Sequence, residues 1–281
     1  PVEAVAVRWP RRREASTPAA PIAELRELTF TGNPDYEAFA WVAESPQLST
    51  LRVLTARWLW GDSLARLVAS PHLAGLKSLR LPSNNLGNPG LLALAASASL
   101  GALDELDFSS MSRHERYIHD PVIRAAGMQA LMAWPGMATV RVLTLTGNDI
   151  SRDGLRALLR SPFAAGLKEL SLRDGRLDGQ AMAEFESAQP DIRLEALDLG
   201  QNVLKDVGAE YVALAPCLRG LKALRLDRCE ISRAGAGLFA QEATFLDDLR
   251  VLDVGHNHFG RAGLAALLAR RPAALHTLGL R

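Results

Sequence analysis

One apolar pattern, L-x-x-L-x-L, recurs ten times along the 281 residues at a nearly constant interval. Successive copies are 25 to 28 residues apart, except for one interval of 37 residues. A fixed period of this length is the signature of a solenoid, in which each unit packs only on its neighbours. The copies begin at Leu25, Leu51, Leu76, Leu103, Val140, Leu167, Leu194, Leu221, Leu249 and Leu275.

A second repeated feature follows the apolar triad and confirms its register. In six of the first nine units, the residue three places after the last apolar position is Asn33, Asn84, Asn148, Asn202, Cys229 or Asn257. An apolar residue comes two places later and a glycine soon after. An Asn side chain at this turn can hydrogen-bond backbone groups that would otherwise be buried without partners.

These motifs resemble those of the leucine-rich repeat family, in its long-repeat form similar to ribonuclease inhibitor. The resemblance covers essentially the whole chain. It implies an α/β fold, a horseshoe-shaped solenoid with a parallel sheet of about eleven strands on its concave face and helices on its convex face. The spacing of the elements demands the same curvature, because neighbouring strands lie about 4.8 Å apart and packed helices about 8–10 Å apart.

The repeat also predicts the organisation of the chain. Residues 1–24 are expected to form a degenerate first repeat or N-terminal cap, since Val2, Val5 and Val7 repeat the triad, and residues 25–281 form the array. Helical stretches are expected after the turns, for example over 90–97, 154–160 and 263–270. The middle apolar residues are expected to form one buried row: Leu79, Leu106, Leu143, Leu170, Leu197, Leu224 and Leu252.

The fourth unit is ten residues too long, and the excess lies at about 111–122, with the sequence MSRHERYIHDPV. An insertion directly after a strand projects from one rim of the horseshoe, next to the concave face. Loops that a rigid scaffold positions often carry function. The alternative is a surface insertion that the fold merely tolerates.

The second unit replaces the Asn turn with Arg57-Trp58-Leu59-Trp60. Trp and Arg are enriched at binding hot spots, so Trp58 is either an exposed contact residue or a side chain that fills the core. This break and the insertion fall within the second to fourth strands and meet at one rim. The hypothetical protein-binding site is Arg57, Trp58, Arg80, Asp107, His114, Arg116, Tyr117 and His119.

The remaining concave positions carry charges of both signs. Asp198, Arg225 and Asp253 alternate on neighbouring strands, and a cross-strand ladder that neutralises itself is the simplest interpretation. The next column contains Arg57, Arg173 and Asp227. With 32 basic and 31 acidic residues and a net charge of +1, the sequence predicts no nucleic-acid partner.

No motif for catalysis or for a cofactor is evident. Phosphate-binding glycine loops and G-x-S-x-G are absent, and no catalytic residue is predicted. His256 with His258, and His114 with His119 and Asp120, lack the further ligands that a metal site needs, so we expect neither a metal nor a cofactor.

The compartment follows from two other features. No run of 18 apolar residues exists, so no membrane association is expected. Cys217 and Cys229 fall in different layers of neighbouring repeats, which argues against a disulfide and favours the cytoplasm. The wealth of Ala, Leu, Arg and Gly is typical of a GC-rich bacterial gene.

The resemblance implies a non-catalytic scaffold that binds a protein or peptide through the concave face and the insertion rim. Two alternatives stay open. One is a regulatory or substrate-docking arm of an enzyme, and the other is a secreted bacterial effector that acts on a host protein. Because the sequence stops within the last triad, we also expect the C-terminal strand edge to be covered by a partner or by further residues.

Overall fold

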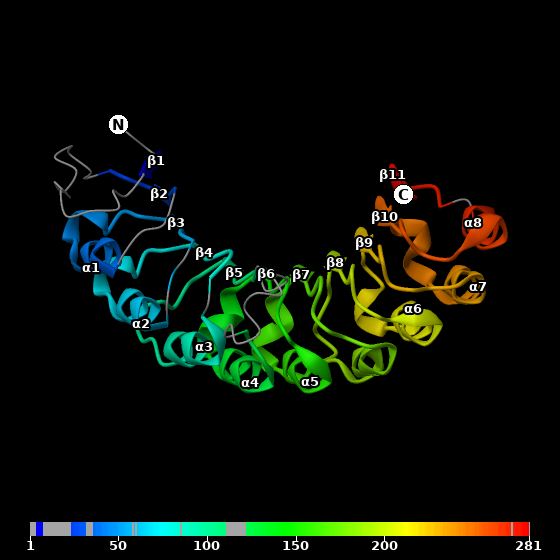
Figure 1. The fold of residues 1–281 in the computed structure, drawn as a ribbon, viewed down its shortest axis with the longest axis horizontal. Coiled ribbons are helices and arrows are strands. Elements are labelled where there is room, and N and C mark those ends of the chain that lie inside the picture. The colour runs from blue at the N-terminus through cyan, green and yellow to red at the C-terminus, as the bar shows by residue number, and fades with distance from the viewer. Residues whose placement is uncertain are drawn as a thin grey trace, which may run out of the picture.

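The chain forms an arc with strands on its inner side and helices on its outer side (Figure 1). The computed structural model describes residues 4–7, 24–31, 36–57, 59, 61–84, 86–110, 122–270 and 272–280. Eleven parallel strands pair in sequence order, which confirms the predicted sheet. They are β1 (Ala4–Val7), β2 (Glu27–Phe30), β3 (Val53–Thr55), β4 (Ser78–Arg80), β5 (Glu105–Asp107), β6 (Val142–Thr144), β7 (Glu169–Ser171), β8 (Ala196–Asp198), β9 (Ala223–Arg225), β10 (Val251–Asp253) and β11 (Thr277–Gly279).

Helices cover the convex side of the described array. The α-helices are α1 (Tyr36–Glu44), α2 (Gly61–Ala69), α3 (Gly87–Ala95), α4 (Ala125–Ala133), α5 (Ser151–Arg160), α6 (Lys205–Leu214), α7 (Arg233–Glu242) and α8 (Gly260–Ala269). Short 3-10 helices lead back toward the sheet: η1 (Pro46–Leu48), η2 (Pro71–Leu73), η3 (Pro135–Thr139), η4 (Pro162–Gly166), η6 (Pro216–Leu218) and η7 (Thr244–Asp248). In the sixth unit, the 3-10 helix η5 (Gly179–Ser187) replaces the α-helix.

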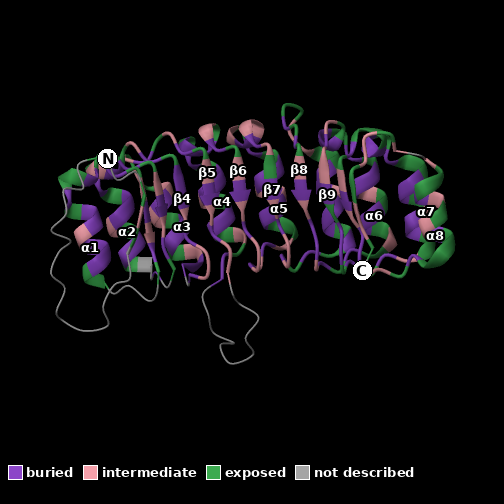
Figure 2. Cartoon of the chain, turned by 90° about the horizontal axis from the view of Figure 1, so that it is seen from above, coloured by how far each residue is buried: buried purple, intermediate pink, exposed green. Residues whose placement is uncertain are grey.

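One continuous apolar core lies between the two layers, and buried residues occur along the whole array from α1 to α8 (Figure 2). Its centre is the predicted row of leucines. Leu79, Leu106 and Leu143 occupy the same register on neighbouring strands and are at most 1% exposed. The other four predicted members, Leu170, Leu197, Leu224 and Leu252, are also buried, so the assigned register is confirmed.

The Asn residues bond the turns of neighbouring units together. Oδ1 of Asn202 accepts hydrogen bonds from the backbone N–H groups of Gly175 and Leu177, at 2.9 and 3.1 Å. Its Nδ2 donates to the carbonyls of Leu172 and Leu199. Asn84, Asn148 and Asn257 repeat this pattern of side-chain bonds, which confirms the role expected for the Asn.

The sixth unit departs from this pattern because Gly175 stands where five other units have Asn. The backbone carbonyl of Gly175 accepts the N–H of Ile150 at 3.1 Å, so this turn is bonded to the preceding unit through its main chain. On either side of Gly175, Asp174 and Arg176 adopt left-handed φ values of 54° and 53°. Arg228 and Glu230 flank Cys229 with similar values of 56° and 57°, so both turns without Asn share this backbone conformation.

The helices start earlier than the predicted stretches over 90–97, 154–160 and 263–270. The helices begin at Gly87, Ser151 and Gly260, three residues before the glycines at which the predicted stretches start. Those later glycines lie inside the helices, where they allow close packing. A methyl group on Gly154, for example, would lie 3.1 Å from Cγ of Met128 on α4, tighter than an ordinary contact.

Replacing Leu197 by Ala is expected to lower the free energy of unfolding by about 2–5 kcal/mol, through lost burial and a cavity. Leu214 is 46% exposed on α6, and its replacement by Ala is the matched control, with an expected change within about 0.5 kcal/mol. Denaturant unfolding measures both. Equal midpoints for the two variants would contradict the placement of Leu197 in the core.

Candidate binding surface

Three of the predicted site residues lie side by side on the concave face. Arg80 and Asp107 are register partners on β4 and β5, and Arg80 also pairs with Thr55 on β3. Arg57 follows β3 by two residues and is exposed. The other five predicted residues lie outside the described part of the chain: Trp58, His114, Arg116, Tyr117 and His119.

Two of these three charges are engaged by their own neighbours. The guanidinium of Arg80 forms a bidentate pair with Glu105, with Nε–Oε1 at 2.9 Å and Nη2–Oε2 at 2.7 Å. This pairing lowers the pKa of Glu105 and raises the pKa of Arg80. Asp107 accepts hydrogen bonds from the N–H and the hydroxyl of Ser109. Any partner at this end of the sheet therefore meets side chains that are already held in place.

The predicted ladder of Asp198, Arg225 and Asp253 is not built from ion pairs. Oδ1 of Asp198 accepts the N–H of Gly200, and Oδ1 of Asp253 accepts the N–H of Gly255. Among the described residues, no carboxylate lies within 4.0 Å of the Arg225 guanidinium. The ladder fails because each aspartate turns toward the backbone of its own loop, and Arg225 remains exposed.

Arg173 instead forms a clasp that crosses an entire strand. It lies two residues beyond β7 and binds Asp227, two residues beyond β9, with Nη1–Oδ1 and Nη2–Oδ2 both at 2.6 Å. Gly200, in the unit between them, allows this reach, because a methyl group there would clash with both partners. Nη1 of Arg173 also lies 3.5 Å from Oδ1 of Asp198.

The two carboxylates around Arg173 are perturbed in opposite directions. The hydrogen bond from Arg173 lowers the pKa of Asp227 below its ordinary value. Burial raises the pKa of Asp198, and the nearby Arg173 offsets this only in part. One aspartate of the cluster is therefore stabilised in its charged form by the fold, whereas the other is destabilised in that form.

Two hollows open on the concave face on either side of this clasp. The first, of about 270 Å³, lies over β6 to β9 and is lined in part by Thr144, Glu169, Ala196 and Arg225. The second, of about 490 Å³, lies toward the C-terminal end. Its lining is Arg173, Gln201, Asp227, Arg228, Asp253, Gly255, His256 and Gly279.

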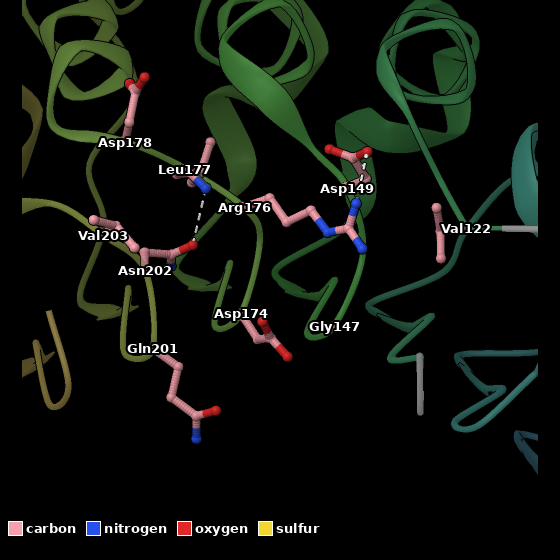
Figure 3. Close-up of a pocket in the computed structure, with 10 residues that line it drawn as sticks. All are labelled: Val122, Gly147, Asp149, Asp174, Arg176, Leu177, Asp178, Gln201, Asn202 and Val203. Carbon is pink, nitrogen blue, oxygen red and sulfur yellow. Dashed lines mark hydrogen bonds and ion pairs between the residues drawn. The ribbon is translucent and has the colours of Figure 1, made fainter. Parts of the chain in front are cut away.

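A third hollow, of about 440 Å³, lies at the rim where the chain leaves β6 to β8 (Figure 3). The guanidinium of Arg176 reaches across it toward Asp149, with Nη1–Oδ2 at 3.6 Å. Gly147 adopts a left-handed φ of 76° and has no side chain at a position where other units have Gln201 and His256, so the rim is lower here. Val122, at the end of the predicted insertion, also lines this hollow.

The described residues show little that suggests covalent or metal chemistry. No three His, Cys, Asp or Glu side chains within them are grouped to hold a metal ion. Cys217 and Cys229 are unpaired and buried, and burial raises their thiol pKa values to about 11 and about 12. In the same part of the chain, no helix has the length and apolarity that crossing a membrane requires.

Comparison with known proteins agrees with this architecture. The family model described as Leucine Rich repeat matches residues 75–95, 136–159, 194–213 and 248–268. Ribonuclease inhibitor from Sus scrofa is 30% identical over 259 residues, which are 87% of this chain and 54% of that protein. The chain is a leucine-rich repeat protein of the ribonuclease-inhibitor-like type.

Other similar proteins share the repeat in different contexts. The NACHT, LRR and PYD domains-containing protein 13 from Homo sapiens is 29% identical over 83% of this leucine-rich repeat chain. The chain spans 22% of that protein and about half of the ribonuclease inhibitor. An internalin from Listeria monocytogenes has 16% identity and a TM-score of 0.49, over 92% of this chain and 68% of the internalin.

The acid dependence of stability should separate the two aspartates. The lowered pKa of Asp227 means that its contribution is complete above the unfolded pKa of about 4 and is lost as the pH falls through the folded pKa. Replacing Asp227 by Asn should therefore reduce the free energy of unfolding at pH 7 by about 1–3 kcal/mol and flatten its fall in acid.

The matched variant, Asp198→Asn, should behave in the opposite way. Because the pKa of Asp198 is raised, its charged form opposes folding above the folded pKa, and this penalty is relieved as the pH falls. We expect no loss of stability from Asp198→Asn at pH 7. Urea unfolding between pH 3 and pH 7 measures both variants, and equal losses at neutral pH would contradict the assignment.

Proposed function

We propose that this leucine-rich repeat chain is a non-catalytic recognition scaffold that binds a protein or peptide through its concave face and the adjacent rim. The observation that carries the proposal is the distribution of hollows. Two lie on the concave face and one on the rim beside Val122, and all three are lined in part by polar side chains. Concave sites with a few placed polar groups are typical of binding surfaces.

The relatives support a binding role at the level of the fold. The name of the Sus scrofa relative states that it inhibits a ribonuclease. Since this chain spans about half of that protein, the shared part supports recognition of a protein but does not identify the partner.

A second candidate function is the docking arm of a larger protein. The human relative, whose name lists NACHT and PYD domains beside its repeats, is matched over 22% of its length, so an array like this one occurs beside other domains. The array would then select a partner or substrate for chemistry carried elsewhere.

The function is tested by blocking the concave face at two places. Thr55→Arg on β3 and Ala223→Arg on β9 place a large side chain on the inner surface, whereas Ala265→Arg does so on the exposed side of α8. Each purified variant is used as bait in the lysate of the source cells, with quantitative mass spectrometry. We expect the prey of the wild type to be lost on at least one concave variant and retained on Ala265→Arg. Prey retained on both concave variants would reject the proposal.

Within this surface, we propose that Arg57, Trp58, Arg80 and Asp107 contact the partner together with the inserted segment, which holds His114, Arg116, Tyr117 and His119. Support comes from the placement of Arg57, Arg80 and Asp107 on three consecutive units.

For a partner found in this way, Trp58→Ala should weaken binding by about 2 kcal/mol or more, about 30-fold in Kd, as expected for a hot-spot Trp. Deletion of residues 111–121 should also weaken it. Calorimetry measures the affinities, and circular dichroism checks that each variant is folded. Wild-type affinity in both variants would place the contact elsewhere on the protein.

A further inference from the structure

Two charged side chains of opposite sign lie unpaired beside one hollow of the concave face. Glu169 on β7 and Arg225 on β9 are both exposed, and within the described chain neither has an oppositely charged group within 4.0 Å. Two other arginines of this surface are held internally, since Arg80 binds Glu105 and Arg173 binds Asp227.

The register of the sheet explains why these two charges stay unpaired. Glu169 lies between Val142 on β6 and Ala196 on β8, which offer no cation. Arg225 lies between Asp198 and Asp253, and both of these carboxylates accept backbone N–H groups of their own loops. Asp198 is also within 3.5 Å of Arg173. These acids thus take their hydrogen bonds from backbone N–H groups, and Arg225 forms no ion pair within 4.0 Å with a described residue.

A hollow separates the two charges. It has a volume of about 270 Å³, and both Glu169 and Arg225 line it. The strand between them contributes Ala196 beside Glu169 and Asp198 beside Arg225. Two strand spacings of about 4.8 Å and two residues of about 3.3 Å rise place the two backbone positions about 12 Å apart on a diagonal. The small side chain of Ala196 leaves space for a partner to approach the sheet between an unpaired anion and an unpaired cation.

We propose that Glu169, Ala196 and Arg225 form a two-charge docking patch for a protein segment of complementary charge. The segment presents a Lys or Arg to Glu169, an Asp or Glu to Arg225, and a small apolar surface to Ala196. This inference rests on the proposed recognition function and names the chemistry of the partner within it. Such complementary charges select a partner and its orientation more than they add affinity.

The test uses a random linear peptide library displayed on phage and selected on the wild-type chain. The enriched peptides should carry one basic and one acidic residue, and their affinities are measured by fluorescence anisotropy. Because like charges then face each other, Glu169→Lys and Arg225→Glu should each weaken binding by at least about tenfold. The effect should shrink in high salt, which screens exposed charges.

Matched controls reverse exposed charges on the convex side, with Glu210→Lys on α6 and Arg219→Glu after η6. They should leave Kd within about twofold, since charges beyond a Debye length of about 10 Å are largely screened. Glu169 forms no ion pair with a described residue, so Glu169→Lys should unfold within about 2 °C of the wild type. Arg225→Glu places a third carboxylate between Asp198 and Asp253 and should unfold at a lower temperature, so its binding is measured well below that temperature.

The outcomes separate this inference from the broader function. Peptides that ignore both reversals but lose affinity on Thr55→Arg bind another part of the concave face, which overturns the patch and keeps the proposed function. Peptides insensitive to every concave variant would count against both. A library that yields no enriched peptide overturns the patch, whereas the capture experiment still decides the function.

Discussion

The backbone of each turn in this solenoid is satisfied by the unit that follows it. Gly175 and Leu177 donate their N–H groups to Asn202, and Cys229 and Ile231 donate theirs to Asn257. A buried turn without these bonds would leave several polar groups unpaired, at about 1–3 kcal/mol each. Each unit therefore depends on its neighbour for more than apolar contact, and the array gains a fixed geometry from one turn to the next.

That fixed geometry decides which charges the concave face can neutralise by itself. Arg80 finds Glu105 on the adjacent strand, and Arg173 finds Asp227 two strands away because Gly200 leaves the path open. Asp253 instead accepts the N–H of Gly255 in its own loop and forms no ion pair with Arg225 on the neighbouring strand. Backbone N–H groups and cations on other strands thus compete for the same carboxylates. Charges that find a partner are held within the surface, and charges that do not are available to a ligand.

This competition also limits what could be predicted from the sequence. The leucine row was predictable because its position repeats in every unit, and the Asn turns because the same residue type recurs at one position in five units. The predicted helical stretches began at glycines such as Gly154, whereas the structure places Gly154 inside its helix, close to Met128 on the preceding helix. Of the candidate site, the sequence predicted that Arg57, Arg80 and Asp107 share one face. It did not predict their partners.

The ion pair between Arg173 and Asp227 shows why such partners cannot be predicted from the repeat alone. Arg173 and Asp227 stand 54 residues apart, two repeats rather than one, so a comparison of adjacent units passes over them. Gly200 was an available signal, because it has no side chain and stands between two opposite charges in the same column. The predicted ladder of Asp198, Arg225 and Asp253 was wrong for a related reason. The repeat shows which residues are neighbours on adjacent strands, but it does not show whether an aspartate accepts a backbone N–H instead.

A surface built in this way recognises a ligand at little conformational cost. Arg80 and Arg173 are held by their carboxylate partners before a ligand arrives, so the rotamers of these side chains need not be fixed on binding. The same rigidity limits what can bind, because a curved sheet of eleven strands cannot rearrange around a poorly matched ligand. Specificity then depends on where unpaired charges and small residues fall along the arc. These are the positions that can change from one repeat to the next without disturbing the leucines and asparagines beneath them.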